Sequence, residues 1–252
     1  MTTVQVGDQT LYYQTFGPVD GPPLLLMHGW MEVGRDLGIV ADSLAGAGYR
    51  IILPDVCGYG RSTPPNRTYP PDFYQRDARV MAGLLDALGI EKAHIMGFSD
   101  GGEIALLMGV LRPDRCRSVI AWGAVGHYTP EVGNYVRNSP PSPITPGQRA
   151  RHANQNIDHW AAEWAQAFLT IVEAGGDLSR SRAHEIACPL LLMVGDRDAL
   201  NPVSDAQAFV AAATHPACTP KVFTVFPDTG HRIHDERIDA FLAAVFGFLR
   251  SF

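Results

Sequence analysis

The chain lacks an excess of positive charge, a long apolar run and a recognisable secretion signal. Its 20 Lys and Arg are outnumbered by 26 Asp and Glu, which gives a net charge of −6, whereas a nucleic-acid-binding protein needs a basic surface. No stretch reaches the ~18 consecutive apolar residues of a membrane span, and residues 1–17 contain no basic segment followed by an apolar one. We therefore expect a cytoplasmic protein with neither a nucleic-acid nor a membrane partner.

The chain also has few cysteines, and they show no regular spacing. None of the four belongs to a Cys-x-x-Cys pair. Scattered cysteines of this kind fit neither a disulfide framework nor a zinc site, so we expect reduced thiols, no metal and no cofactor. They are Cys57, Cys116, Cys188 and Cys218.

Six continuous apolar runs are the main structural signal of the sequence. Such runs predict strands that are buried on both faces, as in a parallel sheet, and helical patterns separate them. A turn at Gly7-Asp8 predicts a preceding hairpin. The alternation predicts a doubly wound α/β sheet. Strands are expected at 4–6, 11–16, 23–27, 50–54, 93–96, 118–122, 190–194 and 222–226, and helices at 37–47, 72–88, 102–111, 203–213 and 238–249.

The stretch 126–186 interrupts this alternation. Its part at 138–147 is rich in proline, which predicts that it is not helical, and 148–172 shows a helical pattern with Trp160, Trp164 and Phe168 on one face. The insertion could pack beside the core as an extra helix pair. We favour a cap, because the insertion leaves the sheet where the carboxyl ends of the strands gather. The expected organisation is a core at 1–125 and 187–252 with a cap at 126–186.

The pentapeptide Gly-Phe-Ser-Asp-Gly at 97–101 is the most informative motif. It lies between an apolar strand and a helical pattern, which is the context in which Gly-x-Ser-x-Gly forms a sharp turn that exposes a serine nucleophile. The turn is so tight that side chains two residues either side of Ser99 would clash, which explains Gly97 and Gly101. The pattern predicts Ser99 as a nucleophile.

A serine nucleophile needs a base and an acid, and in this fold they follow in the order Asp or Glu, then His. Two later strands end in candidates for each. Asp198 is preferred over Asp196 because it lies further past the strand end, whereas Asp196 suits a turn. His231 is preferred over His234 because it lies directly in the loop after the strand.

The oxyanion hole requires two backbone N–H groups. We expect them from Asp100, next to the serine, and from Trp30 in the loop after the first apolar strand, with His28 in a structural role. The side chain of Asp100 has two interpretations. It could complement the dipole of the helix that it begins, or it could form a salt bridge with a cationic group of the substrate.

The order and spacing of these residues resemble those of the α/β-hydrolase family over nearly the whole chain. A narrower resemblance, to the biphenyl-hydrolase-like or valacyclovirase family, rests on the run from 55 to about 129. It includes Asp-Val-Cys-Gly-Tyr-Gly-Arg-Ser at 55–62, Gly-Phe-Ser-Asp-Gly-Gly at 97–102 and Ile-Ala-Trp-Gly-Ala at 120–124.

This resemblance implies a mostly parallel eight-stranded sheet with helices on both faces and a helical cap. It implies hydrolysis of small carboxylic esters, in particular α-amino-acid esters, by a triad of Ser99, Asp198 and His231, with Asp100 binding the α-ammonium group. The chain departs from the family at Cys57, where an arginine is common; its loss would remove a structural charge and leave Cys57 as a lining residue. We expect the substrate to contact Asp100, Trp30, Phe98, Trp160 and Trp164.

Other functions share the same fold and triad. A general carboxylesterase or lactonase, a carbon–carbon bond hydrolase, and a ligand-binding receptor that retains the triad all remain open at this stage. The expected partner is a small-molecule ester, and the expected assembly is a monomer or a small homo-oligomer.

Overall fold

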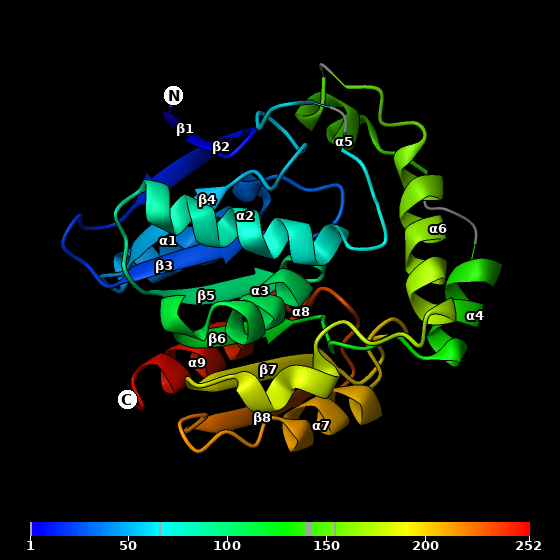
Figure 1. Ribbon diagram of the computed structural model, residues 1–252. Coiled ribbons are helices and arrows are strands. Elements are labelled where there is room, and N and C mark those ends of the chain that lie inside the picture. The colour runs from blue at the N-terminus through cyan, green and yellow to red at the C-terminus, as the bar shows by residue number, and fades with distance from the viewer. Residues whose placement is uncertain (1, 66, 140–142, 154) are drawn as a thin grey trace.

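An eight-stranded sheet forms the centre of the molecule in a computed structural model that describes residues 2–65, 67–139, 143–153 and 155–252 (Figure 1). Its strand order is β1-β2-β4-β3-β5-β6-β7-β8. β1 (Thr2–Val6) and β2 (Gln9–Phe16) form the predicted hairpin, β2 runs antiparallel to β4, and the remaining pairs are parallel. The other strands are β3 (Pro23–Met27), β4 (Arg50–Pro54), β5 (Ala93–Phe98), β6 (Cys116–Trp122), β7 (Leu190–Gly195) and β8 (Lys221–Phe226).

Helices cover both faces of the sheet, as the continuous apolar strands predicted. Alternate residues of one strand enter different cores: Leu25 packs on one face and Leu24 on the other. The first core includes residues of α2 (Phe73–Ala87), α3 (Asp100–Leu111) and α7 (Val203–Ala212), and the second includes residues of α1 (Gly38–Gly46) and α9 (Ile238–Leu249). The short helices η1 (Gly34–Leu37), η2 (Pro113–Arg115) and α8 (Ile233–Glu236) lie in connecting segments.

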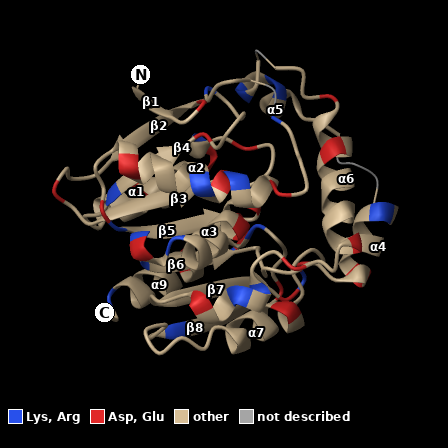
Figure 2. Cartoon of the chain, viewed as in Figure 1, with Lys and Arg blue, Asp and Glu red and all other residues tan. Residues whose placement is uncertain are grey.

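Lys, Arg, Asp and Glu are absent from three of the inner strands of the sheet (Figure 2). β3, β5 and β7 contain none, because a strand with helices on both sides has no face in water. The four cysteines are all buried and free. Within the described ranges, no helix has the length and apolar character needed to cross a membrane.

The segment between β6 and β7 carries α4 (Pro130–Asn138), α5 (Pro146–Arg151), α6 (Trp160–Glu173) and η3 (Arg180–Glu185). In Figure 1, α4, α5 and α6 stand beyond the carboxyl ends of the parallel strands, at the right of the sheet. The segment therefore stands over the loops in which the candidate triad lies (Figure 1). The proposed boundaries 126 and 186 remain a prediction.

Two expectations for this segment were wrong. The pattern over 148–172 predicted one helix, but α5 ends at Arg151 and α6 begins at Trp160, because Asn156 Oδ1 accepts the backbone N–H of Asp158 and stabilises a turn instead. The proline-rich stretch 138–147 was predicted to be non-helical, yet its two ends belong to α4 and α5. Its residues 140–142 lie outside the described ranges.

Helix α4 was not predicted, although its start has a recognisable signal. Thr129 Oγ1 accepts the N–H of Val132, and Pro130 occupies the first helical position, where its missing N–H costs nothing.

Candidate active site

The loops that follow β3, β5, β7 and β8 meet at one edge of the sheet. Because these strands are parallel neighbours or near neighbours, their carboxyl ends lie together, which is where open α/β sheets bind ligands. The loops supply Gly29 and Trp30, Ser99, Asp198 and His231 respectively.

Ser99 lies in a strained turn between β5 and α3. Its φ of 53° and ψ of −120° are unusual for a residue with a side chain. A Cβ atom on Gly97 would lie 2.0 Å from the carbonyl oxygen of Gly101, and one on Gly101 would lie 2.4 Å from that of Met27. Glycine is therefore required at both positions for the strand and the helix to meet at Ser99.

Ser99, His231 and Asp198 form a chain of polar contacts. Ser99 Oγ lies 2.9 Å from His231 Nε2, and His231 Nδ1 lies 2.7 Å from Asp198 Oδ2. Burial raises the pKa of Asp198, but the hydrogen bond and charge of His231, together with the hydrogen bonds from Asn201 and Leu200, outweigh it and hold that pKa below its ordinary value. Asp198 also accepts hydrogen bonds from the N–H groups of Leu200 and Asn201, and from the amide of Asn201. Asn201 was not singled out from the sequence, because an Asn in a loop carries no signal of its own.

The less favoured candidates for the acid and the base, Asp196 and His234, make other contacts. Asp196 Oδ1 accepts the N–H of Thr229 at 3.2 Å and so joins two loops. His234 is buried, its Nδ1 accepts the indole N–H of Trp122 at 3.0 Å, and burial lowers its pKa to about 4. Neither contacts Ser99.

The loop after β3 is held by hydrogen bonds within itself and to its neighbour. His28 Nε2 accepts the N–H of Val56, which makes Nδ1 the donor to the carbonyl of Gly29. That carbonyl also accepts the N–H of Glu32 at 3.3 Å. In a trans peptide the C=O and the following N–H point in opposite directions, so the N–H of Trp30 points away from these two donors. His28 therefore orients the backbone of the loop.

A cavity of about 440 Å³ lies over Ser99 and His231. The aromatic side chains of Trp30, Phe98 and Trp164 line it together with small residues of α6. Trp160 does not reach this wall: its side chain is fully buried, with its ring centroid 5.2 Å from that of Tyr59 and 5.0 Å from that of His152. The full lining comprises Trp30, Glu32, Phe98, Ser99, Tyr135, Val136, Ser139, Gln148, Ala161, Ala162, Trp164, Ala165, Leu200, His231 and Arg232.

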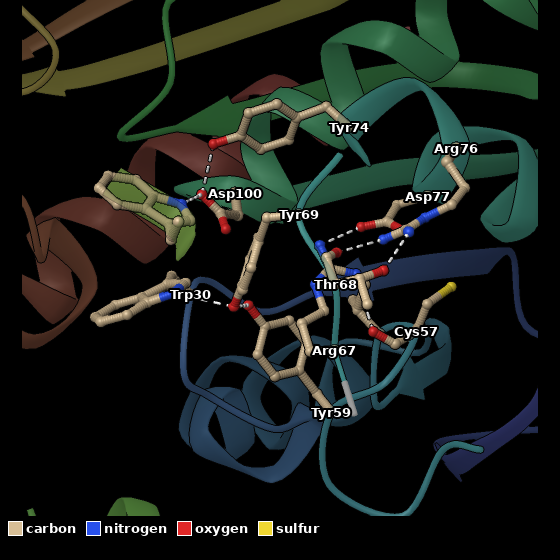
Figure 3. Close-up of polar contacts among 12 residues, drawn as sticks. Trp30, Cys57, Tyr59, Arg67, Thr68, Tyr69, Tyr74, Arg76, Asp77 and Asp100 are labelled. Carbon is tan, nitrogen blue, oxygen red and sulfur yellow. Dashed lines mark hydrogen bonds and ion pairs between the residues drawn. The ribbon is translucent and has the colours of Figure 1, made fainter. Parts of the chain in front are cut away.

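Asp100 is a buried carboxylate with one satisfied oxygen (Figure 3). Its Oδ1 accepts hydrogen bonds from the hydroxyl of Tyr74 at 2.7 Å and from the indole N–H of Trp164 at 3.4 Å. Its Oδ2 is buried and has no hydrogen-bond partner among the described residues. Burial raises the pKa of Asp100 to about 6, although the hydrogen bond from Tyr74 opposes that shift. An unpaired buried carboxylate oxygen costs free energy. Asp100, which was predicted to contact the substrate, does not line the cavity.

The indole of Trp30 is fixed by a network beneath the cavity (Figure 3). Its N–H donates to Tyr69 Oη at 3.1 Å, and the hydroxyls of Tyr69 and Tyr59 lie 2.8 Å apart. The guanidinium of Arg67 lies against both rings, 4.8 Å from the centroid of Tyr59 and 5.1 Å from that of Tyr69. It pairs with the buried carboxylate of Asp77 at 2.5 Å.

Arg67 also changes the expectation for Cys57. Its Nη1 donates to the carbonyl of Cys57 at 2.9 Å, so a guanidinium lies beside position 57 although that position has no arginine. Cys57 is buried, burial raises the pKa of its thiol, and it does not line the cavity. The departure at this position therefore does not leave the region without a structural charge.

Within the described ranges, no group of three or more His, Cys, Asp or Glu side chains could hold a metal ion.

Sequence comparison gives the family to which this sheet and this strained turn belong. The model of the α/β-hydrolase fold family matches residues 22–174, which is more than half of the chain. The chain belongs to this family.

Among the relatives, the serine hydrolase BPHL from Homo sapiens is 28% identical over 256 residues, covering 98% of this chain and 85% of the relative. This match confirms the resemblance to the biphenyl-hydrolase-like family. A 2-hydroxy-6-oxo-6-phenylhexa-2,4-dienoate hydrolase from Comamonas testosteroni is 32% identical over 136 residues, covering 50% of this chain and 45% of the relative. The solved structure of a meta-cleavage product hydrolase from Pseudomonas fluorescens IP01 superposes with a TM-score of 0.76 at 21% identity, covering 99% of this chain and 97% of that one.

Proposed function

We propose that this protein hydrolyses small α-amino-acid esters through an acyl-enzyme formed on Ser99. The observation that carries the proposal is the contact chain from Ser99 Oγ through the two ring nitrogens of His231 to Asp198. His231 takes the proton of Ser99 as its oxygen attacks the ester carbonyl, and Asp198 stabilises the imidazolium that forms. His231 then gives the proton to the departing alcohol.

In this proposal the N–H groups of Trp30 and Asp100 stabilise the negative oxygen of each tetrahedral intermediate. Asp100 is the first residue of α3, so its N–H is one of the unpaired donors at the start of that helix. Water then attacks the acyl-enzyme with His231 as base, which releases the amino acid and restores Ser99.

The preference for an α-ammonium group rests on Asp100. Its carboxylate follows Ser99 directly, and its buried Oδ2 has no partner among the described residues. A substrate ammonium near the scissile carbonyl would supply the missing partner and a charge-assisted hydrogen bond. The indole of Trp164, which makes the longer of the two bonds to Oδ1, is the group that would move to admit it.

A carbon–carbon bond hydrolase is the second candidate, because one relative and one superposed structure are named as hydrolases of that kind. Such a substrate would not need a carboxylate beside the nucleophile. Substrates with and without an amine therefore separate the two candidates.

Replacing Asp100 with asparagine is expected to lower kcat/KM about 10- to 100-fold for a free phenylalanine ester, because a hydrogen bond between two charged groups is lost. The N-acetyl form of the same ester should change less than about threefold, since it carries no ammonium. Asp196→Asn is the matched control, because that carboxylate joins two loops without contacting Ser99. Equal losses for both esters would contradict a role in binding the amine.

The selectivity is also expected to depend on pH. Burial raises the pKa of Asp100 to about 6, so the carboxylate is neutral below that pH and charged above it. The ratio of kcat/KM for the free ester to that for the N-acetyl ester should rise as pH passes 6. It should fall again as the ester amine loses its proton, at about pH 8. Taking the ratio cancels every effect of pH that both esters share, and a ratio that stays flat in pH would contradict the proposed role of Asp100.

A further inference from the structure

The carboxylate of Glu32 joins two loops that are 200 residues apart in the sequence. Its Oε2 accepts the backbone N–H of Gly29 at 3.1 Å, and its Oε1 pairs with Nη1 of Arg232. Gly29 precedes Trp30, the candidate oxyanion donor, and Arg232 follows His231. Glu32 therefore connects the loop of the oxyanion donor to the loop of the base.

Arg232 extends this connection to the nucleophile. Its guanidinium carbon lies 5.3 Å from the ring centroid of Phe98, the residue before Ser99, and its Nε donates to Asp235 Oδ2 at 2.5 Å. The backbone of Gly29 is close to the same turn, since a Cβ on Gly29 would lie 3.1 Å from the Cβ of Ser99. One ion pair thus contacts residues at three of the four loops on which the proposed chemistry depends, those after β3, β5 and β8.

Burial and charge distinguish this role from direct substrate binding. Both side chains line the cavity, so Arg232 could in principle attract an anionic substrate. Its charge is already matched by the carboxylates of Glu32 and Asp235. The carboxylate of Glu32 is largely withdrawn from water, since its side chain is 10% exposed, whereas the side chain of Arg232 is 44% exposed. An ion pair with one buried member is screened less than a pair in which both members are exposed.

We propose that Glu32 and Arg232 are positioning residues that set the oxyanion donor of the 28–32 loop against His231 and Ser99. The bond from Gly29 to Glu32 fixes the backbone immediately before the Trp30 N–H, and the Arg232 contact fixes the backbone immediately after His231. A misplacement of about 1 Å in such a constellation costs on the order of 100-fold in rate. This inference rests on the proposed Ser99 chemistry but applies to esters with or without an amine.

The experiment uses p-nitrophenyl butyrate as the ester and phenylboronic acid as an analogue of the tetrahedral intermediate. Glu32→Ala is expected to lower kcat about 10- to 100-fold with KM within about threefold, and to weaken boronate binding by a similar factor. Glu32→Gln should lose less, because its amide oxygen still accepts the N–H of Gly29. Arg232→Gln combined with Glu32→Gln should lose less than the product of the two single effects, because both break the same pair.

Arg197→Gln is the matched control. It removes the exposed pair between Arg197 and Asp228, which also joins two neighbouring loops, and water screens that pair. Its kcat should remain within about twofold of wild type. Unchanged kcat and boronate affinity in Glu32→Ala would overturn the inference, as would a loss confined to KM or one that follows a lower folded fraction in thermal melts. Wild-type protein without esterase activity would instead contradict the proposed function.

Discussion

Replacing Ser99 with alanine is expected to lower kcat for ester hydrolysis by roughly 10⁴- to 10⁶-fold, because the oxygen that forms the acyl-enzyme is removed. A small residual rate should remain from substrate binding and the oxyanion donors. His231→Ala should have a loss of similar size, and the double variant should be little worse than either, because residues that act as one unit are not additive. Initial rates on p-nitrophenyl butyrate measure all three.

Two controls accompany the Ser99 and His231 variants: a variant at a histidine outside the cavity, and covalent labelling of the nucleophile. His184→Ala removes an exposed histidine outside the cavity and should retain wild-type kcat. A fluorophosphonate should label wild type at Ser99, as read by mass spectrometry of the peptides, and should not label Ser99→Ala. Activity of Ser99→Ala within tenfold of wild type would contradict the assignment of the nucleophile.

Replacing Arg67 with alanine is expected to lower the free energy of unfolding by about 3–5 kcal/mol. The residue is 2% exposed, and its removal leaves the fully buried carboxylate of Asp77 with the partly exposed Arg76, 3.3 Å away, in place of its closer partner Arg67. It also removes the cation that lies against the rings of Tyr59 and Tyr69. For a chain of this size the melting temperature should fall by roughly 6–20 °C.

Thermal and urea unfolding measure this effect, with Arg182→Ala as the control. Arg182 pairs with Glu185 at the surface, where both side chains are more than a third exposed, so its loss should cost no more than about 1 kcal/mol. Arg67→Met combined with Asp77→Leu should be more stable than Arg67→Ala alone, because no buried carboxylate then lacks its closest cation. A melting temperature for Arg67→Ala equal to that of Arg182→Ala would contradict the importance of the buried pair.

The core of the fold could be predicted from the sequence because its signals are local and agree with one another. Continuous apolar strands such as 190–194 require burial on both faces, and Gly97 and Gly101 mark a turn that no other residue could make. The candidates Ser99, Asp198 and His231 could be selected because each follows a strand, and parallel strands bring their carboxyl ends together.

The features of the site that could not be predicted depend on contacts between residues far apart in the sequence, and such contacts carry no local signal. Trp160 shares a helical pattern with Trp164, yet it packs against Tyr59 and His152 because the helix begins only at Trp160. The contact of Arg67 with Cys57 and the pair of Glu32 with Arg232 likewise became visible only in the folded chain.

The most direct test of the account is the ratio of kcat/KM for a free phenylalanine ester to that for its N-acetyl counterpart, measured on wild type at pH 7. At this pH the carboxylate of Asp100 is mostly charged, since its pKa is about 6, and the ester amine is mostly protonated. The account predicts that the free ester is preferred about 10- to 100-fold, the contribution expected of one charge-assisted hydrogen bond. Equal rates, or a preference for the N-acetyl ester, would contradict the assignment of the protein as an α-amino-acid ester hydrolase anchored by Asp100.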